Sequence, residues 1–349
     1  MELSTIINQY YSAYLTQYAG SVLPGQLKAI NAICRCRTPD SGEVYVSCHV
    51  CGHGQWHPLS CGHRNCPKCQ NHQADQWINR QQDKLLPVDY YMATFTLPYA
   101  LRPLAWNHQR KVYSLLFAYV SDVLKDFGLT PKNLGAEIGM TMVLHTHNRR
   151  LDFHPHVHVV VPGGGIDKRR RQWKKKKGKF LFNEFALAKV FRARFLGALK
   201  KEGFSVPQNT PAEWVVDCRR VGSGISALKY LSRYLYRGVI SEKNIVSNQN
   251  GRVTFKYIES KTGTPRYRTL NGEDFLHLIM QHILPKGFRR VRDYGFLHGN
   301  AKKLLGLVQL ILHVVIKGCN QRPRPAFLCA RCGASMAIVG FRLKAWNPG

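Results

Sequence analysis

The segment FHPHVHVVVPGGG, residues 153–165, carries histidines at positions 154, 156 and 158 and ends in three glycines. Side chains of a β-strand point alternately to its two faces. His154, His156 and His158 therefore share one face of a predicted strand, and the opposite face is wholly apolar. The apolar face predicts packing against a core, which leaves the histidine face to line a cleft or to meet solvent.

Two interpretations of this histidine face follow from the residues. Imidazoles two positions apart on a strand have Cβ atoms about 7 Å apart, close enough to bind one ion. The segment GMTMVLHTH, residues 139–147, predicts a partner strand, and a turn near 148–150 would place His145 opposite His154. His145 is then a candidate third ligand beside His156 and His158. The alternative is a polar strand face that binds no metal.

The remaining periodicities predict an α+β protein, with helical spacing in some segments and β-rich texture in others. We expect four regions: N-terminal helices at 1–33, a zinc-binding module at 34–75, a domain of mixed strands and helices at 85–260, and a mostly helical region with a terminal cysteine knuckle at 261–349.

The charge balance points to a polyanionic partner. The 349 residues include 51 Lys and Arg against 20 Asp and Glu, a formal net charge of +31. Hydrophobic residues make up 44%, which excludes a disordered chain. A chain this basic typically binds nucleic acid, the alternatives being a basic solvated surface or a membrane-surface protein. With no run of eighteen apolar residues and no signal-peptide pattern at the N-terminus, we expect no membrane partner and a cytoplasmic, nucleoid-associated location.

Seven of the eleven cysteines fall between Cys34 and Cys69. In a reducing compartment such clustering predicts metal binding rather than disulfides. Two C-x2-C knuckles separated by fourteen residues have the spacing of a structural zinc site, whose expected ligands are Cys48, Cys51, Cys66 and Cys69. Cys36 and Cys61, with two nearby histidines, are candidates for a second zinc. Cys329 and Cys332 form half of a further site, so we expect one or two structural Zn²⁺ ions.

Two further segments carry candidate chemistry. Tyr230 and Tyr234, in ISALKYLSRYLYRG (225–238), lie at i and i+4 on one helical face. Such tyrosines are commonly core residues, but a phenol can also be a nucleophile. The block KRRRQWKKKKGK (168–179) follows the glycines and is either a solvated loop or a contact to the DNA backbone, with an indole available to stack on a base. The candidate DNA-binding residues are Lys168, Arg169, Arg170, Arg171, Trp173, Lys174, Lys175, Arg219, Arg220 and Arg233.

In combination, these motifs resemble the two-tyrosine HUH rolling-circle transposases of bacterial insertion sequences, where HUH denotes His-hydrophobic-His, here His156-Val157-His158. The cysteine-rich stretch CRCRTPDSGEVYVSCHVCGHGQWHPLSCGHRNCPKCQ (34–70) resembles the zinc-binding domain of that family. The blocks FTLPYALRPLAWNHQRKVYSLLF, LHTHNRRLDFHPHVHVVVPGGG, ALKYLSRYLYRGVIS and LPKGFRRVRDYGFL follow in the family's order.

The resemblance implies an HUH endonuclease domain over 85–260, with a central antiparallel sheet flanked by helices. It implies cleavage and rejoining of single-stranded DNA through a 5′-phosphotyrosine, with Tyr230 and Tyr234 as nucleophiles. His156 and His158 would hold Mg²⁺ or Mn²⁺. The expected DNA partners are single-stranded DNA at the transposon ends and target DNA. Host replication or helicase functions are expected to open the strands, because the sequence contains no G-x4-G-K-[ST] ATPase motif. The alternatives are a rolling-circle replication initiator or relaxase, and a non-catalytic zinc DNA-binding protein.

Overall fold

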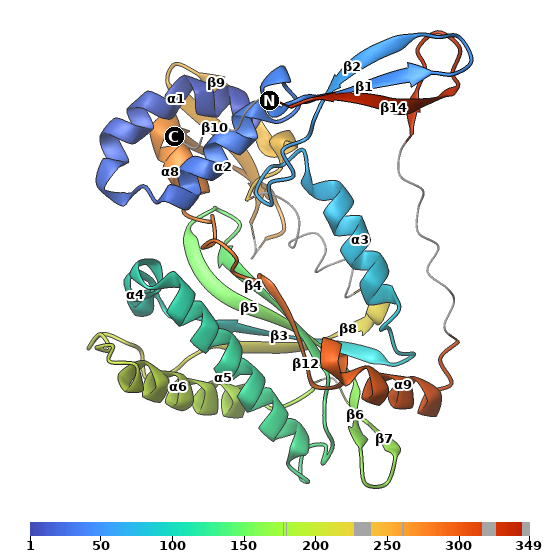
Figure 1. The fold of residues 1–349 in the computed structure, drawn as a ribbon. Helices are drawn as coiled ribbons and strands as arrows, with labels where there is room; N and C mark the ends of the chain where they lie inside the picture. Colours follow the sequence, from blue (N-terminus) through green and yellow to red (C-terminus); the bar gives the residue numbers. More distant parts are fainter. Residues whose placement is uncertain (177, 179, 227–238, 260–261, 316–325, 344–349) are drawn as a thin grey trace. The chain divides into compact units, whose positions relative to one another are not determined.

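A computed structural model describes residues 1–176, 178, 180–226, 239–259, 262–315 and 326–343, with the backbone alone for 70–75. The chain forms two compact units (Figure 1). The first comprises residues 1–75, 236–283 and 320–349, and the second comprises 76–235 and 284–319. No helix among the described residues is both long enough and apolar enough to cross a bilayer.

The second unit is built on a five-stranded antiparallel sheet whose order is β12-β4-β5-β3-β8. Its strands are β3 (Asp89–Thr96), β4 (Met140–His147), β5 (Phe153–Pro162), β8 (Val216–Ser223) and β12 (Val291–Tyr294). Strand β5 lies at the centre because its valine face is fully buried: Val157, Val159 and Val161 have no exposed surface. The quoted segment is therefore the strand that organises this sheet.

Helices cover one face of this sheet (Figure 1). They are α4 (Arg102–Asn107), α5 (Gln109–Leu129) and α6 (Glu184–Lys201). Helix α5 buries Val112, Leu116 and Val120 at helical spacing against the valine face of β5. Helix α6 starts at the cap residue Asn183, whose side-chain oxygen accepts a 2.9 Å hydrogen bond from the Ala186 amide. The helices that the structure describes in this core thus lie on the apolar side of the sheet, opposite the histidines.

The second unit also contains a basic hairpin, β6 (Gly164–Asp167) with β7 (Gln172–Lys175), and helix α9 (Lys302–Ile311). The hairpin and the helix share a small core with Ile166, Phe296 and Val308. Gly164 is required at the start of the hairpin because an added Cβ would lie 2.5 Å from the Trp173 ring.

The first unit combines helices with two antiparallel sheets. Its helices are α1 (Leu3–Tyr18), α2 (Pro24–Arg35) and α8 (Gly272–Met280), and helix α3 (Gln70–Gln82) runs from this unit into the second one. One sheet has the order β11-β10-β9, from β9 (Ile245–Gln249), β10 (Arg252–Ile258) and β11 (Pro265–Asn271). The other has the order β13-β14-β1-β2, from β1 (Glu43–Cys48), β2 (Gly54–Pro58), β13 (Phe327–Leu328) and β14 (Ser335–Arg342). The last sheet thus joins the two ends of the sequence.

The prediction of a mostly helical region at 261–349 is wrong. Helices α8 and α9 are present, but β11, β12, β13 and β14 also lie in this range. Strand β12 has only four residues, VRDY, which is too short to show an alternating pattern, and it exists because it pairs with the edge of β4. The predicted boundaries also differ from the compact units, because both units combine segments far apart in the sequence.

Candidate functional site

Three histidines converge on the face of the central sheet that lies opposite the helices α4, α5 and α6. His145 on β4 lies directly opposite His156 on β5, and His158 lies two residues further along β5. One ring nitrogen from each of the three lies within 4.8 Å of the others. The side chains are almost fully buried, with exposed fractions of 7%, 9% and 8% for His145, His156 and His158. The predicted register is wrong by two residues, since His145 faces His156 rather than His154. A shift of two keeps the side chain on the same face.

Hydrogen bonds to the far ring nitrogens orient the two β5 imidazoles. His156 Nδ1 donates to the backbone carbonyl of His154 at 2.6 Å, which leaves Nε2 as the nitrogen with a free lone pair. His158 Nδ1 lies 3.0 Å from the Thr94 hydroxyl on the neighbouring strand β3. Such partners set the tautomer and the direction of histidines that bind metals.

The cluster is electrically neutral at physiological pH. Burial lowers the pKa of His156 to about 4 and that of His158 to about 3. Burial also holds the pKa of His145 well below its usual range, with the neighbouring imidazoles adding to the effect. A neutral imidazole is the form that binds a metal. Three such nitrogens on one buried face fit a divalent ion and leave coordination positions for oxygen ligands.

His154 has a different environment from the other three. It is only partly buried, and its Nδ1 accepts a hydrogen bond from Arg102 Nη2. Burial lowers its pKa to about 4, with His156 and Arg102 contributing. Its ring nitrogens are not among those that converge. His154 therefore supports the cluster through its backbone carbonyl and links it to Arg102.

The other predicted site residues of the central domain fall into two groups. Tyr230, Tyr234 and Arg233 lie outside the described residues. Arg219 lies on β8, and its Nε is 3.5 Å from the carboxylate of Asp217 on the same strand. Asp217 pairs in register with Thr94 of β3. Arg220 Nη2 lies 2.7 Å from the Asp89 carboxylate. Both arginines are thus paired with acidic side chains, yet exposed.

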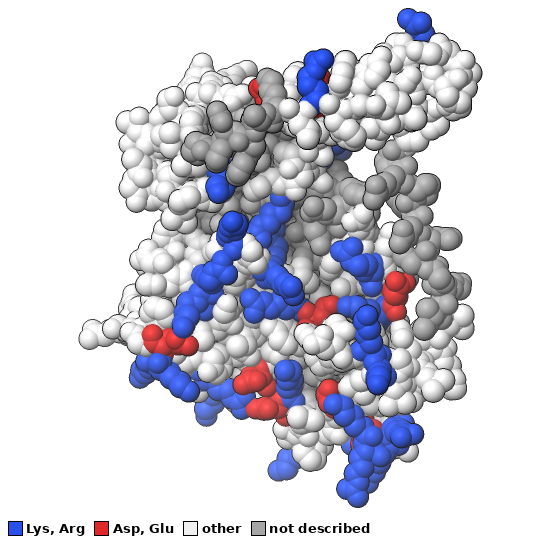
Figure 2. Space-filling model, in the orientation of Figure 1, with Lys and Arg blue, Asp and Glu red and all other residues white. Residues whose placement is uncertain are grey.

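The basic block forms the β6–β7 hairpin, and basic side chains gather at its end (Figure 2). Arg169, Arg170 and Arg171 are exposed in the turn. Lys168 pairs with Glu137 at 2.5 Å, and Lys174 donates to the Gly135 carbonyl at 2.8 Å. Lys175 at the end of β7 is exposed.

The expectation that Trp173 is available for base stacking is wrong. Its indole is partly buried and packs against Phe296 of the core beneath the hairpin, with ring centroids 5.9 Å apart. The arginines of the turn, unlike this ring, are exposed to solvent.

One cysteine cluster brings together four thiols from three segments of the first unit. Cys36 ends α2, Cys61 follows β2, and Cys66 and Cys69 precede α3. The sulfurs of Cys36 and Cys69 are 3.3 Å apart, and those of Cys61 and Cys69 are 3.6 Å apart. These distances exceed a disulfide bond of about 2.05 Å. They approach the edge of about 3.8 Å that a tetrahedron with Zn–S bonds of about 2.3 Å requires. A hydrogen bond from Cys61 lowers the pKa of the Cys66 thiol to about 5, which favours the thiolate.

The second cluster joins two knuckles from opposite ends of the chain. Cys48 lies 3.5 Å from Cys332, and Cys51 lies 3.5 Å from Cys329, measured between sulfurs. The pairing of β1 with β14 brings these knuckles together. In both, the amide four residues after the first cysteine donates back to that cysteine's carbonyl, at 2.9 and 2.8 Å. The donor is a glycine with positive φ, Gly52 in one knuckle and Gly333 in the other.

The predicted grouping of Cys48, Cys51, Cys66 and Cys69 at one ion is therefore wrong, because each knuckle finds a different partner. The expected use of histidines at a second zinc is also wrong, since both clusters consist of cysteines alone. A signal in the sequence distinguishes the pairs. CHVCG at 48–52 and CARCG at 329–333 share a C-x2-C-G pattern, whereas CPKCQ at 66–70 lacks the glycine.

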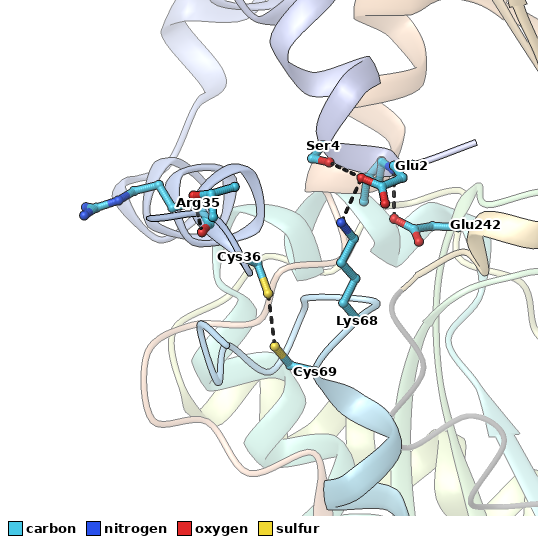
Figure 3. A network of polar contacts seen from close by, with 9 residues as sticks. Glu2, Ser4, Arg35, Cys36, Lys68, Cys69 and Glu242 are labelled. Atoms are coloured by element: carbon cyan, nitrogen blue, oxygen red, sulfur yellow. Dashed lines mark hydrogen bonds and ion pairs between the residues drawn. The ribbon is translucent and has the colours of Figure 1, made fainter. Parts of the chain in front are cut away.

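Lys68 lies between Cys66 and Cys69 of the first cluster and forms an ion pair with an acidic neighbour (Figure 3). Its Nζ lies 2.8 Å from the Glu2 carboxylate. Glu242 completes this network by accepting a 2.9 Å hydrogen bond from the Leu3 amide. The contacts connect the N-terminus of α1 to the cysteine cluster within the first unit.

Comparisons with known proteins identify the family of this chain. A family model described as "Transposase zinc-binding domain" matches residues 6–97, and one described as "Putative transposase" matches residues 139–304. The "Putative transposase y4qJ" of Sinorhizobium fredii is 34% identical over 331 residues, covering 88% of this chain and 83% of that protein. The "Transposase for insertion sequence element IS801" of Pseudomonas savastanoi pv. phaseolicola is 28% identical over 383 residues, covering 97% and 90%. No solved structure matches this chain.

These matches define the class as transposases, proteins that act on DNA. The chain belongs to the transposases of insertion sequences that carry an N-terminal zinc-binding domain. The zinc-binding domain and the two cysteine clusters together support structural zinc. Cys329 and Cys332 lie outside both matched ranges, although the structure assigns them to a cluster with Cys48 and Cys51.

Proposed function

We propose that this transposase nicks and rejoins single-stranded DNA at the ends of its element through a tyrosine-linked intermediate. The observation that carries the proposal is the convergence of His145, His156 and His158, neutral and buried, on one face of the central sheet. A bound Mg²⁺ or Mn²⁺ would polarise the scissile phosphate and stabilise the leaving 3′ oxygen. Mn²⁺ accepts imidazole nitrogen more readily than Mg²⁺, which favours oxygen ligands.

The protein's own residues would supply the remaining chemistry. The phenol oxygen of Tyr230 or Tyr234 loses its proton and attacks the phosphorus, the bond from phosphorus to the 3′ oxygen breaks, and the 3′ oxygen takes up one proton, so that the proton lost by the phenol is balanced. The products are a 5′-phosphotyrosine and a free 3′-OH. A later 3′-OH can reverse the step and join strands, because the covalent link retains the phosphodiester bond energy. Two tyrosines allow two successive transfers.

DNA backbone contacts would come from the arginines of the β6–β7 turn and from Arg219. The turn presents Arg169, Arg170 and Arg171 to solvent. We further propose a cytoplasmic, nucleoid-associated location and dependence on host replication or helicase functions for strand opening. A replication initiator or relaxase would use the same chemistry, but both matched families and both relatives are transposases.

The test is incubation of the zinc-loaded protein with labelled single-stranded DNA from both element ends and Mn²⁺. We expect a covalent protein–DNA adduct that survives denaturation and disappears when Tyr230 and Tyr234 are both changed to Phe. His156→Ala should also abolish the adduct while leaving the zinc content unchanged. Folded, zinc-loaded protein that forms no adduct with either end would refute the proposal. If the double Tyr→Phe variant still forms the adduct, another residue is the nucleophile and the proposed role of the two tyrosines is refuted. Wild-type protein that binds the DNA but forms no adduct would be a non-catalytic DNA-binding protein.

A further inference from the structure

Arg102 connects the histidine cluster to the start of α4. Its Nη2 donates a hydrogen bond to His154 Nδ1, and the ring of His154 lies 5.1 Å from that of His156, measured between centroids. Packing holds this corner in place, because the Leu97 amide donates to the Pro155 carbonyl at 3.1 Å and Trp106 meets Phe153 edge to face at 5.5 Å. The guanidinium is therefore one side chain removed from the proposed metal ligands.

The charge of Arg102 is partly desolvated and lacks a carboxylate partner among the described residues. Its Nε is buried and makes no hydrogen bond there. The closest acidic influence, Asp152, is engaged by Asn148 Nδ2 at 3.1 Å and by Arg150 Nε at 3.8 Å. A desolvated cation without an anion is costly, so this position favours binding of an anionic ligand. A phosphate group matches the planar fork of an arginine.

Tyr99 provides an aromatic surface at the same corner. Its side chain is 77% exposed, and the guanidinium of Arg102 lies 5.0 Å from its ring centroid. The backbone beneath it is rigid, because the turn Tyr99–Leu101 buries Leu101 completely and closes with a hydrogen bond from Leu101 to Pro98 at 3.1 Å. An exposed tyrosine on a fixed turn, next to a cation, has the features of a base-stacking platform for single-stranded nucleic acid.

We propose that Tyr99 and Arg102 form a nucleotide clamp next to the histidine cluster. Arg102 binds the phosphate that adjoins the scissile one, because His154 separates it from the proposed metal ligands. Tyr99 stacks on the base attached to that nucleotide. The inference rests on the proposed function, since it names the subsite that positions single-stranded DNA for cleavage. It makes Tyr99 and Arg102 substrate-binding residues, whereas His154 positions Arg102.

The experiment measures adduct formation under single-turnover conditions with Mn²⁺, on end oligonucleotides that carry one abasic site at each position in turn. For wild type, we expect one abasic position beside the cleavage site to raise the half-saturating protein concentration about tenfold, as loss of one stacked base does. Tyr99→Ala should cause the same increase on intact DNA, with no further increase at that abasic position. Tyr99→Trp should restore stacking. The maximal rate should change less than threefold in either variant.

Arg102→Met should raise the half-saturating concentration and reduce its salt dependence by about one phosphate contact, while Arg102→Lys should retain part of the affinity. Matched controls are Tyr267→Ala, an exposed tyrosine on β11, and Arg192→Met on α6. Both should behave like wild type. Fluorescence anisotropy of the same oligonucleotides without added divalent ion measures the DNA affinity of each variant, and so tests the clamp independently of cleavage.

The outcomes separate the two proposals. If wild type forms no adduct, the proposed function fails, and the anisotropy measurement still decides whether Tyr99 recognises one base position. If wild type forms the adduct and Tyr99→Ala retains both its affinity and its abasic profile, the clamp is refuted while the proposed function stands. The clamp is also refuted if Tyr99→Ala loses affinity by the same factor, relative to wild type, on every oligonucleotide of the abasic series.

Discussion

Cys332→Ser is the substitution that tests the arrangement of the zinc sites most directly. In the structure, Cys332 lies 3.5 Å from Cys48 and 3.6 Å from Cys51, so it completes a four-sulfur cluster with Cys329. Serine removes one thiolate and leaves three. We expect the purified protein to fall from two zinc ions per chain to one, because structural zinc sites need all four ligands.

The structural effect should be confined to the sheet β13-β14-β1-β2. The buried aliphatic side chains of this sheet are few, mainly Val44, Val46 and Met336. Zinc binding contributes about 10–16 kcal/mol in small modules of this kind, so it is the dominant stabilising contribution for a sheet with so small a core. Loss of the ion should therefore expose β14 to protease. The other cluster, with Cys66, should keep its metal.

The assay is the ratio of zinc to protein by mass spectrometry, combined with limited proteolysis. Cys66→Ser should also lose one zinc, and the double variant Cys66→Ser with Cys332→Ser should lose both. Cys34→Ser is the matched control, since Cys34 is partly exposed and belongs to neither cluster. Two zinc ions retained in Cys332→Ser would contradict the pairing of the chain ends and favour a site built from Cys48, Cys51, Cys66 and Cys69.

Three further predictions concern other parts of the molecule. Gly272→Ala should lower the free energy of unfolding of the first unit by about 1–3 kcal/mol, because the new Cβ would lie 2.3 Å from the Tyr10 ring. In the same thermal melts, Gly197→Ala should not destabilise the protein, because no atom lies within 4 Å of the added Cβ. Replacing Arg169–Arg171 with glutamines should reduce the slope of log Kd against log salt for single-stranded DNA by about 2, at about 0.7 per phosphate contact, and an unchanged slope would exclude the turn from the interface. His156→Ala should lower Mn²⁺-dependent adduct formation at least about a hundredfold with little change in DNA affinity, and a parallel loss of affinity would indicate a folding defect instead.

Local pattern was sufficient to predict the central hairpin. Alternation of valine and histidine in 153–161 required a strand with one buried face, and the structure confirms it as β5. The partner strand at 140–147 is confirmed as well. The register was not predictable, because a bulge between His145 and His147 shifts the pairing by one residue and the loop 148–152, which joins the paired residues His147 and Phe153, shifts it by another. Such a bulge depends on backbone contacts that a pattern of side-chain polarity does not report.

The sequence by itself determined the ligand types, the strand that carries the histidines and the chain's preference for a polyanion, because these properties depend on residue identity and on spacing within one element. Only the tertiary structure decided which groups share a site. Cys48 and Cys332, 284 positions apart, meet because β14 pairs with β1, and Arg102 reaches His154 because α4 packs beside β5. Contacts across such separations form when the chain closes on itself, and their geometry is set by packing and strand register rather than by local periodicity.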